Sequence, residues 1–212
     1  GFPPGGPADE TAPVLSWSIP ENNTVNVAKD HAIVFRFSEA MDEESVEENV
    51  FIVPIPEIWP RLSWEDRGKT LVITPAGSLD DNTTYVVSIG AKASDRQRNT
   101  LDESIVLCFS TGSTLENRRV SGRVLPLSFT GDEPEKVSDV DVIAYRLERE
   151  DSNPDPSNDV PQFFTQTGSD GTYELAGLSQ GTFRLFAVGD KDGDGFYTAG
   201  YDMIGIAPHD IE

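Results

Sequence analysis

The stretch Ala32-Ile33-Val34-Phe35-Arg36-Phe37 predicts a β-strand, because its large apolar side chains occupy every second position. Successive side chains of a β-strand point to opposite faces of a sheet, so Ile33, Phe35 and Phe37 share one face, which we assign to the core. The same two-residue period recurs in short runs separated by turn residues. The sequence therefore predicts an all-β fold.

The predicted strands form two groups on either side of a polar join at residues 113–119. The first group comprises residues 14–19, 32–37, 51–53, 61–64, 70–74, 84–89 and 104–111, and the second 120–124, 138–147, 160–167, 172–175, 182–188 and 203–207. A chain of 212 residues is comfortable for two domains of about 100 residues each. We expect two tandem β-sandwich domains, residues 14–116 and 117–212, after a flexible Pro- and Gly-rich tether at residues 1–13.

One acidic segment is the exception to the strand pattern. Residues 41–49 predict one or two helical turns with Asp42 as the N-cap, because carboxylates near a helix N-terminus accept free backbone N–H groups. The segment also holds four glutamates, Glu43, Glu44, Glu47 and Glu48. Acids crowded in one short stretch are usually a solvated face, so we do not expect a catalytic cluster there.

The first group of strands resembles a known family. The resemblance rests on the segments Phe37-Ser38-Glu39-Ala40-Met41-Asp42, Thr70-Leu71-Val72-Ile73-Thr74-Pro75, Thr84-Tyr85-Val86-Val87 and Phe109-Ser110-Thr111. Together, from Pro13 to Gly112, they resemble the S-layer-type bacterial Ig-like domain. This resemblance implies an Ig-like β-sandwich.

Two details of that resemblance can be checked in a structure. Leu79, six residues before Tyr85, has the form of a tyrosine corner, in which the phenol hydroxyl bonds to nearby backbone. The family usually has a glycine before the asparagine that corresponds to Asn99, whereas this chain has Arg98. We therefore expect a wider turn at residues 95–99.

The second group is similar to another family. Val120-Ser121-Gly122-Arg123-Val124, the run from Asp170 to Leu178 and Gly181-Thr182-Phe183-Arg184-Leu185 are similar to the carboxypeptidase regulatory-like, transthyretin-like sandwich. The resemblance spans most of Arg118 to Ala207. It implies a structural and adhesive module, and the family name implies no peptidase activity.

The tether resembles a third class of sequence. Gly5-Gly6-Pro7, with Asp9 and Pro13, resembles the start of mature surface lipoproteins of the Bacteroidetes type. That resemblance implies a lipidated cysteine ahead of Gly1, and hence a membrane association only through an N-terminal lipid anchor that this chain does not contain.

An acidic loop in the second domain carries the candidate ion site. Asp190, Asp192 and Asp194 alternate at the first, third and fifth positions of a calcium loop, Gly195 is at the sixth, and Phe196 offers a carbonyl at the seventh. Asp202 is the nearest carboxylate to the twelfth position, one residue late. Strands rather than helices flank the loop. We predict a Ca²⁺ site of Asp190, Asp192, Asp194, Phe196 and Asp202, with a simple acidic hairpin turn as the alternative.

Charge and composition exclude other classes of function. The net charge of −21 argues against nucleic acid, which requires clustered Lys and Arg. The two histidines, His31 and His209, stand alone, and Cys108 lies in an apolar strand, where packing is the usual role of a thiol. No nucleophile and base motif occurs, so we expect no enzymatic activity.

We therefore expect a non-catalytic structural or adhesion module, a spacer in a larger bacterial surface or secreted protein, with a surface protein or a glycan as partner. Two alternatives stay open. One is a carbohydrate-binding appendage of a surface polysaccharide-processing system, which an exposed pair of Trp59 and Trp64 would favour. The other is the non-catalytic part of a larger hydrolase.

Overall fold

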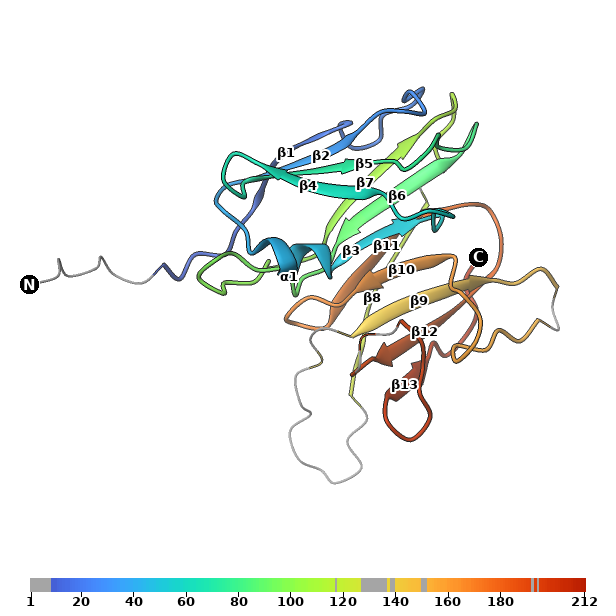
Figure 1. Ribbon diagram of the computed structural model, residues 1–212. Helices are drawn as coiled ribbons and strands as arrows, with labels where there is room; N and C mark the ends of the chain where they lie inside the picture. Colours follow the sequence, from blue (N-terminus) through green and yellow to red (C-terminus); the bar gives the residue numbers. More distant parts are fainter. Residues whose placement is uncertain are drawn as a thin grey trace, which may run out of the picture.

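The computed structural model describes residues 9–116, 118–126, 137, 140–149, 152–191, 193 and 195–212. Within these residues the chain forms thirteen strands and one short helix (Figure 1), which confirms the predicted all-β fold. The elements are β1 (Leu15–Ile19), β2 (Ile33–Phe37), α1 (Glu43–Glu47), β3 (Val50–Val53), β4 (Arg61–Glu65), β5 (Thr70–Thr74), β6 (Thr84–Ile89), β7 (Ile105–Ser110), β8 (Arg118–Arg123), β9 (Asp141–Arg146), β10 (Phe163–Gln166), β11 (Thr172–Leu178), β12 (Phe183–Gly189) and β13 (Met203–Ile206). In the described part, no helix has the length and apolar character needed to cross a membrane.

The first sandwich consists of two antiparallel sheets, one with the strand order β1-β2-β5-β4 and the other β3-β6-β7. β2 pairs with β5 so that Ile33 lies opposite Ile73 and Phe35 opposite Leu71. All four side chains are buried. The alternation of apolar residues in the stretch 32–37 therefore predicted the core face correctly.

The short helix α1 begins where the sequence predicted a cap. The Asp42 carboxylate accepts a hydrogen bond from the backbone N–H of Ser45 at 3.3 Å. Val46 is the buried residue of the helix, and the four glutamates of this segment are exposed to solvent. The helix is thus a solvated acidic face, held to the core by Val46.

The second sandwich pairs a four-stranded sheet, β10-β9-β12-β13, with a two-stranded sheet, β11-β8. One core cluster, which includes Val142, Leu175 and Leu185, joins the two sheets. A separate cluster of Ile143, Tyr145, Phe186 and Val188 lies on the other face of the larger sheet. β9 is therefore buried on both faces.

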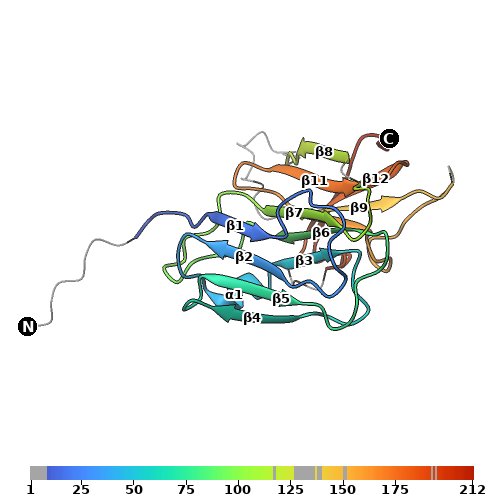
Figure 2. The same cartoon turned by 90° about the horizontal axis from the view of Figure 1, so that it is seen from above.

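The two sandwiches dock edge to face. Strands β10 and β11 lie against β3, β6 and β7 of the first sandwich (Figures 1 and 2). Val86 and Cys108 alternate with residues of the first core, yet both are buried. Phe51 of β3 stacks on Phe164 of β10 with 4.0 Å between ring centroids. The docking therefore packs side chains of the two sandwiches together.

Each sandwich contributes a glycine where the other approaches closely. Gly177 of β11 has a φ of +76°, and a Cβ there would lie 2.2 Å from Cγ2 of Val86. Glycine is favoured at such a site, because it has no Cβ and adopts positive φ without strain. On the other side, a Cβ at Gly90 would lie 2.1 Å from Oε1 of Gln166. The contact between the sandwiches is therefore so close that it leaves no room for a Cβ atom at either glycine.

The segment that joins the two sandwiches is hydrogen-bonded to the first sandwich. The backbone N–H of Glu116 donates to Oγ1 of Thr84 at 3.0 Å, and β8 begins at Arg118. Asn117, near which we predicted the boundary, lies outside the described residues.

Residues 1–8 of the predicted tether also lie outside the described residues. The rest of the tether contacts the first sandwich: Pro13 is buried, and the carbonyl of Asp9 accepts a hydrogen bond from Nδ2 of Asn99 at 3.1 Å.

Candidate functional site

The predicted ion loop connects β12 to β13 in the second sandwich. Gly189 at the end of β12 pairs with Met203 at the start of β13, so the two strands bring the ends of the loop together. Of the five predicted ligands, Asp190, Phe196 and Asp202 are described, whereas Asp192 and Asp194 lie outside the described residues. The structure therefore gives the geometry of the two ends of the loop.

Asp190 organises the first half of the loop. Its Oδ1 accepts from the backbone N–H of Gly193 at 2.8 Å, and its Oδ2 accepts from that of Gly195 at 2.9 Å. Both glycines have positive φ, +75° and +80°, which glycine adopts without strain. The loop thus turns tightly around the carboxylate that was predicted to come first in the ligand order.

Asp202 closes the loop from its far end. It is 9% exposed, and its Oδ1 accepts from the backbone N–H of Lys191 at 3.1 Å while its Oδ2 accepts from that of Thr198 at 2.8 Å. The first of these bonds brings Asp202 next to Asp190 in space. A carboxylate offers about four lone-pair sites, so two backbone bonds leave capacity for a cation.

The loop also covers part of the second core. The backbone N–H of Tyr197 donates to the carbonyl of Pro156 at 3.0 Å, and its ring packs against the cluster that contains Tyr145 and Phe186. Burial raises the pKa of Tyr145 to about 12, with Asp159 and Asp155 adding to the shift. The conformation of the loop is therefore coupled to the packing of the sheet beneath it.

The structure also brings together three carboxylates that sequence reasoning did not connect. Ligand oxygens of Asp9, Glu39 and Asp95 lie within 4.8 Å of one another. Burial raises the pKa of Glu39, and repulsion from Asp9 and Asp95 raises it further. Burial alone would raise the pKa of Asp95 too, but hydrogen bonds from Asn99 and Gln97 outweigh it and lower the pKa. Of these two acids, Glu39 therefore takes up a proton before Asp95.

Asp95 has a structural role that explains the turn beside it. Its Oδ1 accepts from the backbone N–H groups of Gln97 and Asn99 at 2.7 and 2.9 Å. The wider turn that we expected at residues 95–99 is wrong. Arg98 adopts a φ of +71° and its N–H donates to the carbonyl of Asp95 at 3.1 Å, so the turn stays tight with an arginine where the family has glycine.

The tyrosine corner is confirmed. Oη of Tyr85 accepts from the backbone N–H of Asp80 at 2.9 Å and donates to Oδ2 of the same residue at 3.4 Å. The ring of Tyr85 stacks on Phe109 at 5.6 Å between centroids. The corner fixes the segment that precedes β6.

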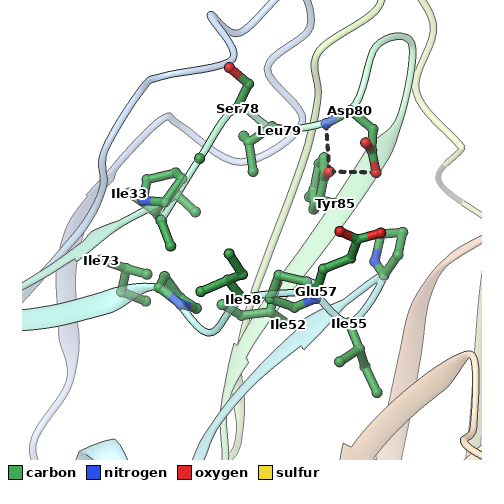
Figure 3. Close-up of a pocket in the computed structure, with 16 residues that line it drawn as sticks. Ile33, Ile52, Ile55, Glu57, Ile58, Ile73, Ser78, Leu79, Asp80 and Tyr85 are labelled. Carbon is green, nitrogen blue, oxygen red and sulfur yellow. Dashed lines mark hydrogen bonds between the residues drawn. The ribbon is translucent and has the colours of Figure 1, made fainter.

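A pocket of about 220 Å³ opens beside this corner (Figure 3). It lies between the segment that follows β3 and the segment that follows β5, and three core residues, Ile33, Ile52 and Ile73, line it. Two carboxylates, Glu57 and Asp80, also line it. The signal for this pocket in the sequence was weak, because its walls come from segments about twenty residues apart.

The remaining candidates from the sequence have mixed outcomes. Trp59 is 49% exposed, but Trp64 is half-buried, stacks on Phe37, and donates from Nε1 to Glu47 at 2.9 Å. The two indoles therefore do not form an exposed pair. Cys108 is buried, which raises the pKa of its thiol to about 11, so the packing role is confirmed.

Comparisons with known proteins support the first half of the chain. The family described as "Bacterial Ig-like domain" matches residues 9–111. A search of curated proteins found no match. The family match ends before β8, so the carboxypeptidase regulatory-like resemblance of the second sandwich stays a prediction.

Similar solved structures share little sequence with this chain. They include an LD transpeptidase, LdtMt1, in complex with imipenem (16% identity, TM-score 0.35, 65% of this chain and 65% of that chain) and an L,D-transpeptidase from Mycobacterium smegmatis (18%, 0.36, 74% and 77%). The N-terminal part of the bacterial S-layer protein SbsC is a third (12%, 0.35, 92% and 43%). The chain thus spans 65% of the first and less than half of the third.

These structural likenesses extend no function to this chain, because their TM-scores lie below 0.5. The family match rests on the sequence itself and covers just under half of the chain, from the residues ahead of β1 to the end of β7. The β1–β7 sandwich is therefore similar to the bacterial Ig-like domain.

Proposed function

We propose that this chain is a non-catalytic structural and adhesion module of a larger bacterial cell-surface or secreted protein. The observation that carries the proposal is the docking of the second sandwich onto β3, β6 and β7, in a chain whose first sandwich matches the bacterial Ig-like family. A spacer must hold its two ends in a fixed relation. Sandwiches that share a fitted contact do this better than two joined by a free linker.

Two further elements of the proposal concern the ends of the chain. We assign the second sandwich to the carboxypeptidase regulatory-like type on the motifs of residues 120–124 and 170–178. Attachment to a membrane would come through a lipidated cysteine ahead of Gly1. Such an anchor would place both sandwiches outside the cytoplasm.

Calcium is the third element. We propose that Asp190, Asp192, Asp194, the carbonyl of Phe196 and Asp202 bind one Ca²⁺ ion, which takes six to eight oxygen ligands. The closeness of Asp190 to Asp202 and the tight turn at two glycines support this set. By holding the loop, the ion would hold Tyr197 against the second core and so stiffen this sandwich.

Thermal unfolding in calcium and in excess chelator tests the calcium site. Extracellular calcium modules bind with dissociation constants of about 10⁻⁴ to 10⁻³ M. A calcium concentration about ten times the dissociation constant should raise the free energy of unfolding by about 1.4 kcal/mol. Magnesium should do less, because it requires octahedral geometry and gives up its waters reluctantly.

Two variants sharpen the test. Asp192→Asn together with Asp194→Asn should abolish the calcium response. Asp170→Asn is the matched control, because Asp170 also accepts a backbone N–H in a turn, that of Thr172, but lies outside the loop. Identical melting curves in calcium and in chelator would return the loop to an acidic hairpin turn, with the structural role unaffected.

The carbohydrate-binding alternative is weaker. A sugar platform requires an exposed aromatic face, and Trp59 offers one. Trp64 is already engaged by Phe37 and Glu47. We therefore favour the structural module.

A further inference from the structure

The pocket beside the tyrosine corner is the feature that the structural role leaves unexplained. We propose that it binds one apolar side chain of a partner protein, presented on a segment that carries Lys or Arg next to that side chain. The size, the charge and the rigidity of the pocket favour such a partner, and none of them involves the calcium loop.

The size of the pocket favours a side chain over a free small molecule. Pockets that enclose a drug-sized ligand measure about 300–1,000 Å³. This pocket measures about 220 Å³, and its inner wall consists of core residues, Ile33, Ile52 and Ile73. A single branched or aromatic side chain would bury its surface against that wall, as anchor residues do at the centre of protein interfaces.

The rim of the pocket extends the apolar surface outward. Ile58 is 69% exposed and Ile55 is 54% exposed, and both belong to the segment between β3 and β4. Figure 3 shows Ile58 near Ile52 and Ile73. Isoleucines that expose so much surface at the mouth of a cavity would lose it on contact with a partner, which is a favourable change.

The charge of the pocket selects the partner. Glu57 and Asp80 are the charged residues among the 16 that line it, so both charges are negative. Lys29, whose carbonyl accepts from the N–H of Leu79, pairs with Asp81 at 3.1 Å and does not line the pocket. In a chain of net charge −21, a basic partner is both steered to the site and paired at its rim.

The walls are fixed before any partner arrives. Pro54, Pro56 and Pro60 stand in the segment after β3, where each ring restricts the backbone. On the opposite side, the hydrogen bonds between Tyr85 and Asp80 hold the segment before β6. A site that needs little ordering loses little entropy on binding.

The proposal is tested by titrating the full chain with short peptides and following its backbone amide signals by NMR. The probe is a capped six-residue peptide with leucine between two lysines. We expect saturable shifts at Ile33, Ile58 and Leu79, weakened by salt. A peptide with glutamates in place of the lysines, and one with serine in place of the leucine, should each bind at least about fivefold more weakly.

Variants of the chain test the apolar contact and the charge of the pocket separately. Ile58→Ser should weaken the binding of the lysine–leucine peptide at least about fivefold, while Leu125→Ser, at a side chain that is 72% exposed elsewhere, should leave it unchanged. Glu57→Gln should reduce both the affinity and its salt dependence, and Glu65→Gln on β4 should reduce neither. Unfolding midpoints check that each variant is folded.

Three outcomes would overturn the proposal. The first is equal binding of the lysine and glutamate peptides, which would remove the charge argument. The second is the absence of shifts at the pocket at millimolar peptide. The third is saturation of the same signals by a neutral oligosaccharide and not by the peptide, which would make the pocket a glycan site.

Discussion

The two sandwiches differ in how they bury their apolar side chains. The first holds one continuous core cluster between its two sheets, and the family match coincides with it. The second holds two smaller clusters, one on each face of the β10-β9-β12-β13 sheet, and its edge strand β13 is exposed along its whole length. The first sandwich therefore has the larger continuous core, and the second relies more on contacts outside its own two sheets.

Two parts of the chain, the first sandwich and the acidic loop, cover the second sandwich. It rests on β3, β6 and β7, with Phe164 stacked on Phe51. The acidic loop packs Tyr197 against the cluster of Ile143, Tyr145, Phe186 and Val188, against which Phe164 also packs. The stability of the chain therefore depends on the contact between the sandwiches and on the acidic loop, as well as on the two cores.

The largest expected effect comes from breaking the contact at Gly177. Gly177→Ala places a Cβ 2.2 Å from Val86 at a φ of +76°. Positive φ costs a residue with a side chain about 1–2 kcal/mol, and an overpacked core costs about 1–3 kcal/mol more. We expect a loss of about 2–5 kcal/mol in the free energy of unfolding, measured with urea.

Gly200→Ala is the matched control for this variant. Gly200 has a φ of +82° and a Cβ there would meet nothing within 4 Å. It should therefore lose only about 1 kcal/mol, from backbone strain. Equal losses in the two variants would mean that the approach of Gly177 to Val86 contributes nothing.

A smaller effect, which is lost at low pH, should come from the ion pair that holds the end of the second sandwich. Arg184 donates from Nε and Nη2 to the two carboxylate oxygens of Asp210, each at 2.8 Å. Hydrogen bonds from Arg184 lower the pKa of Asp210 below its ordinary 3.8. Because the folded pKa is lowered, the pair stabilises the chain above pH 3.8 and loses its effect as the pH falls through the folded value.

Asp210→Asn should therefore cost about 1 kcal/mol at pH 7 and progressively less as the pH falls below 3.8, measured by unfolding across that range. The matched pair in the first sandwich is Lys29–Asp81, whose side chains are 42% and 76% exposed. Asp81→Asn should cost less than about 0.5 kcal/mol. A loss at Asp210 that is unchanged at low pH would show that its charge is not the cause.

The smallest expected effect has the opposite sign and belongs to the first sandwich. Arg98 is exposed and has a φ of +71°. Arg98→Gly removes strain of about 1–2 kcal/mol but adds about 0.5–1 kcal/mol of chain entropy in the unfolded state. We expect a gain of about 0.5 kcal/mol in the free energy of unfolding. A loss would mean that the arginine side chain stabilises the turn by more than its backbone strain.

Period-two patterning predicted most strands closely, because most strands of the first sandwich have one apolar face. The bounds of Thr70–Thr74 and Thr84–Ile89 agree with the structure. The docking of the sandwiches was missed, although a signal existed. Tyr85 to Ile89 and Ile105 to Phe109 are apolar almost throughout, which is typical of strands that are buried on both faces.

The sites show the limit of local pattern. The loop from Asp190 to Asp202 could be predicted because its residues are close in sequence, and the structure does bring its two ends together. The cluster of Asp9, Glu39 and Asp95 could not, since its members are up to 86 residues apart and meet only through the fold. The pocket likewise lies between the segments that follow β3 and β5, and no short sequence motif relates these two segments.

Differential scanning calorimetry of the full chain shows whether the second sandwich is stable because it is docked on the first. We expect one cooperative transition, with equal calorimetric and van't Hoff enthalpies, and Gly177→Ala should lower the whole transition or split it in two. Two separate transitions in the unmodified chain, of which Gly177→Ala shifts neither toward lower temperature, would show that docking does not stabilise the second sandwich.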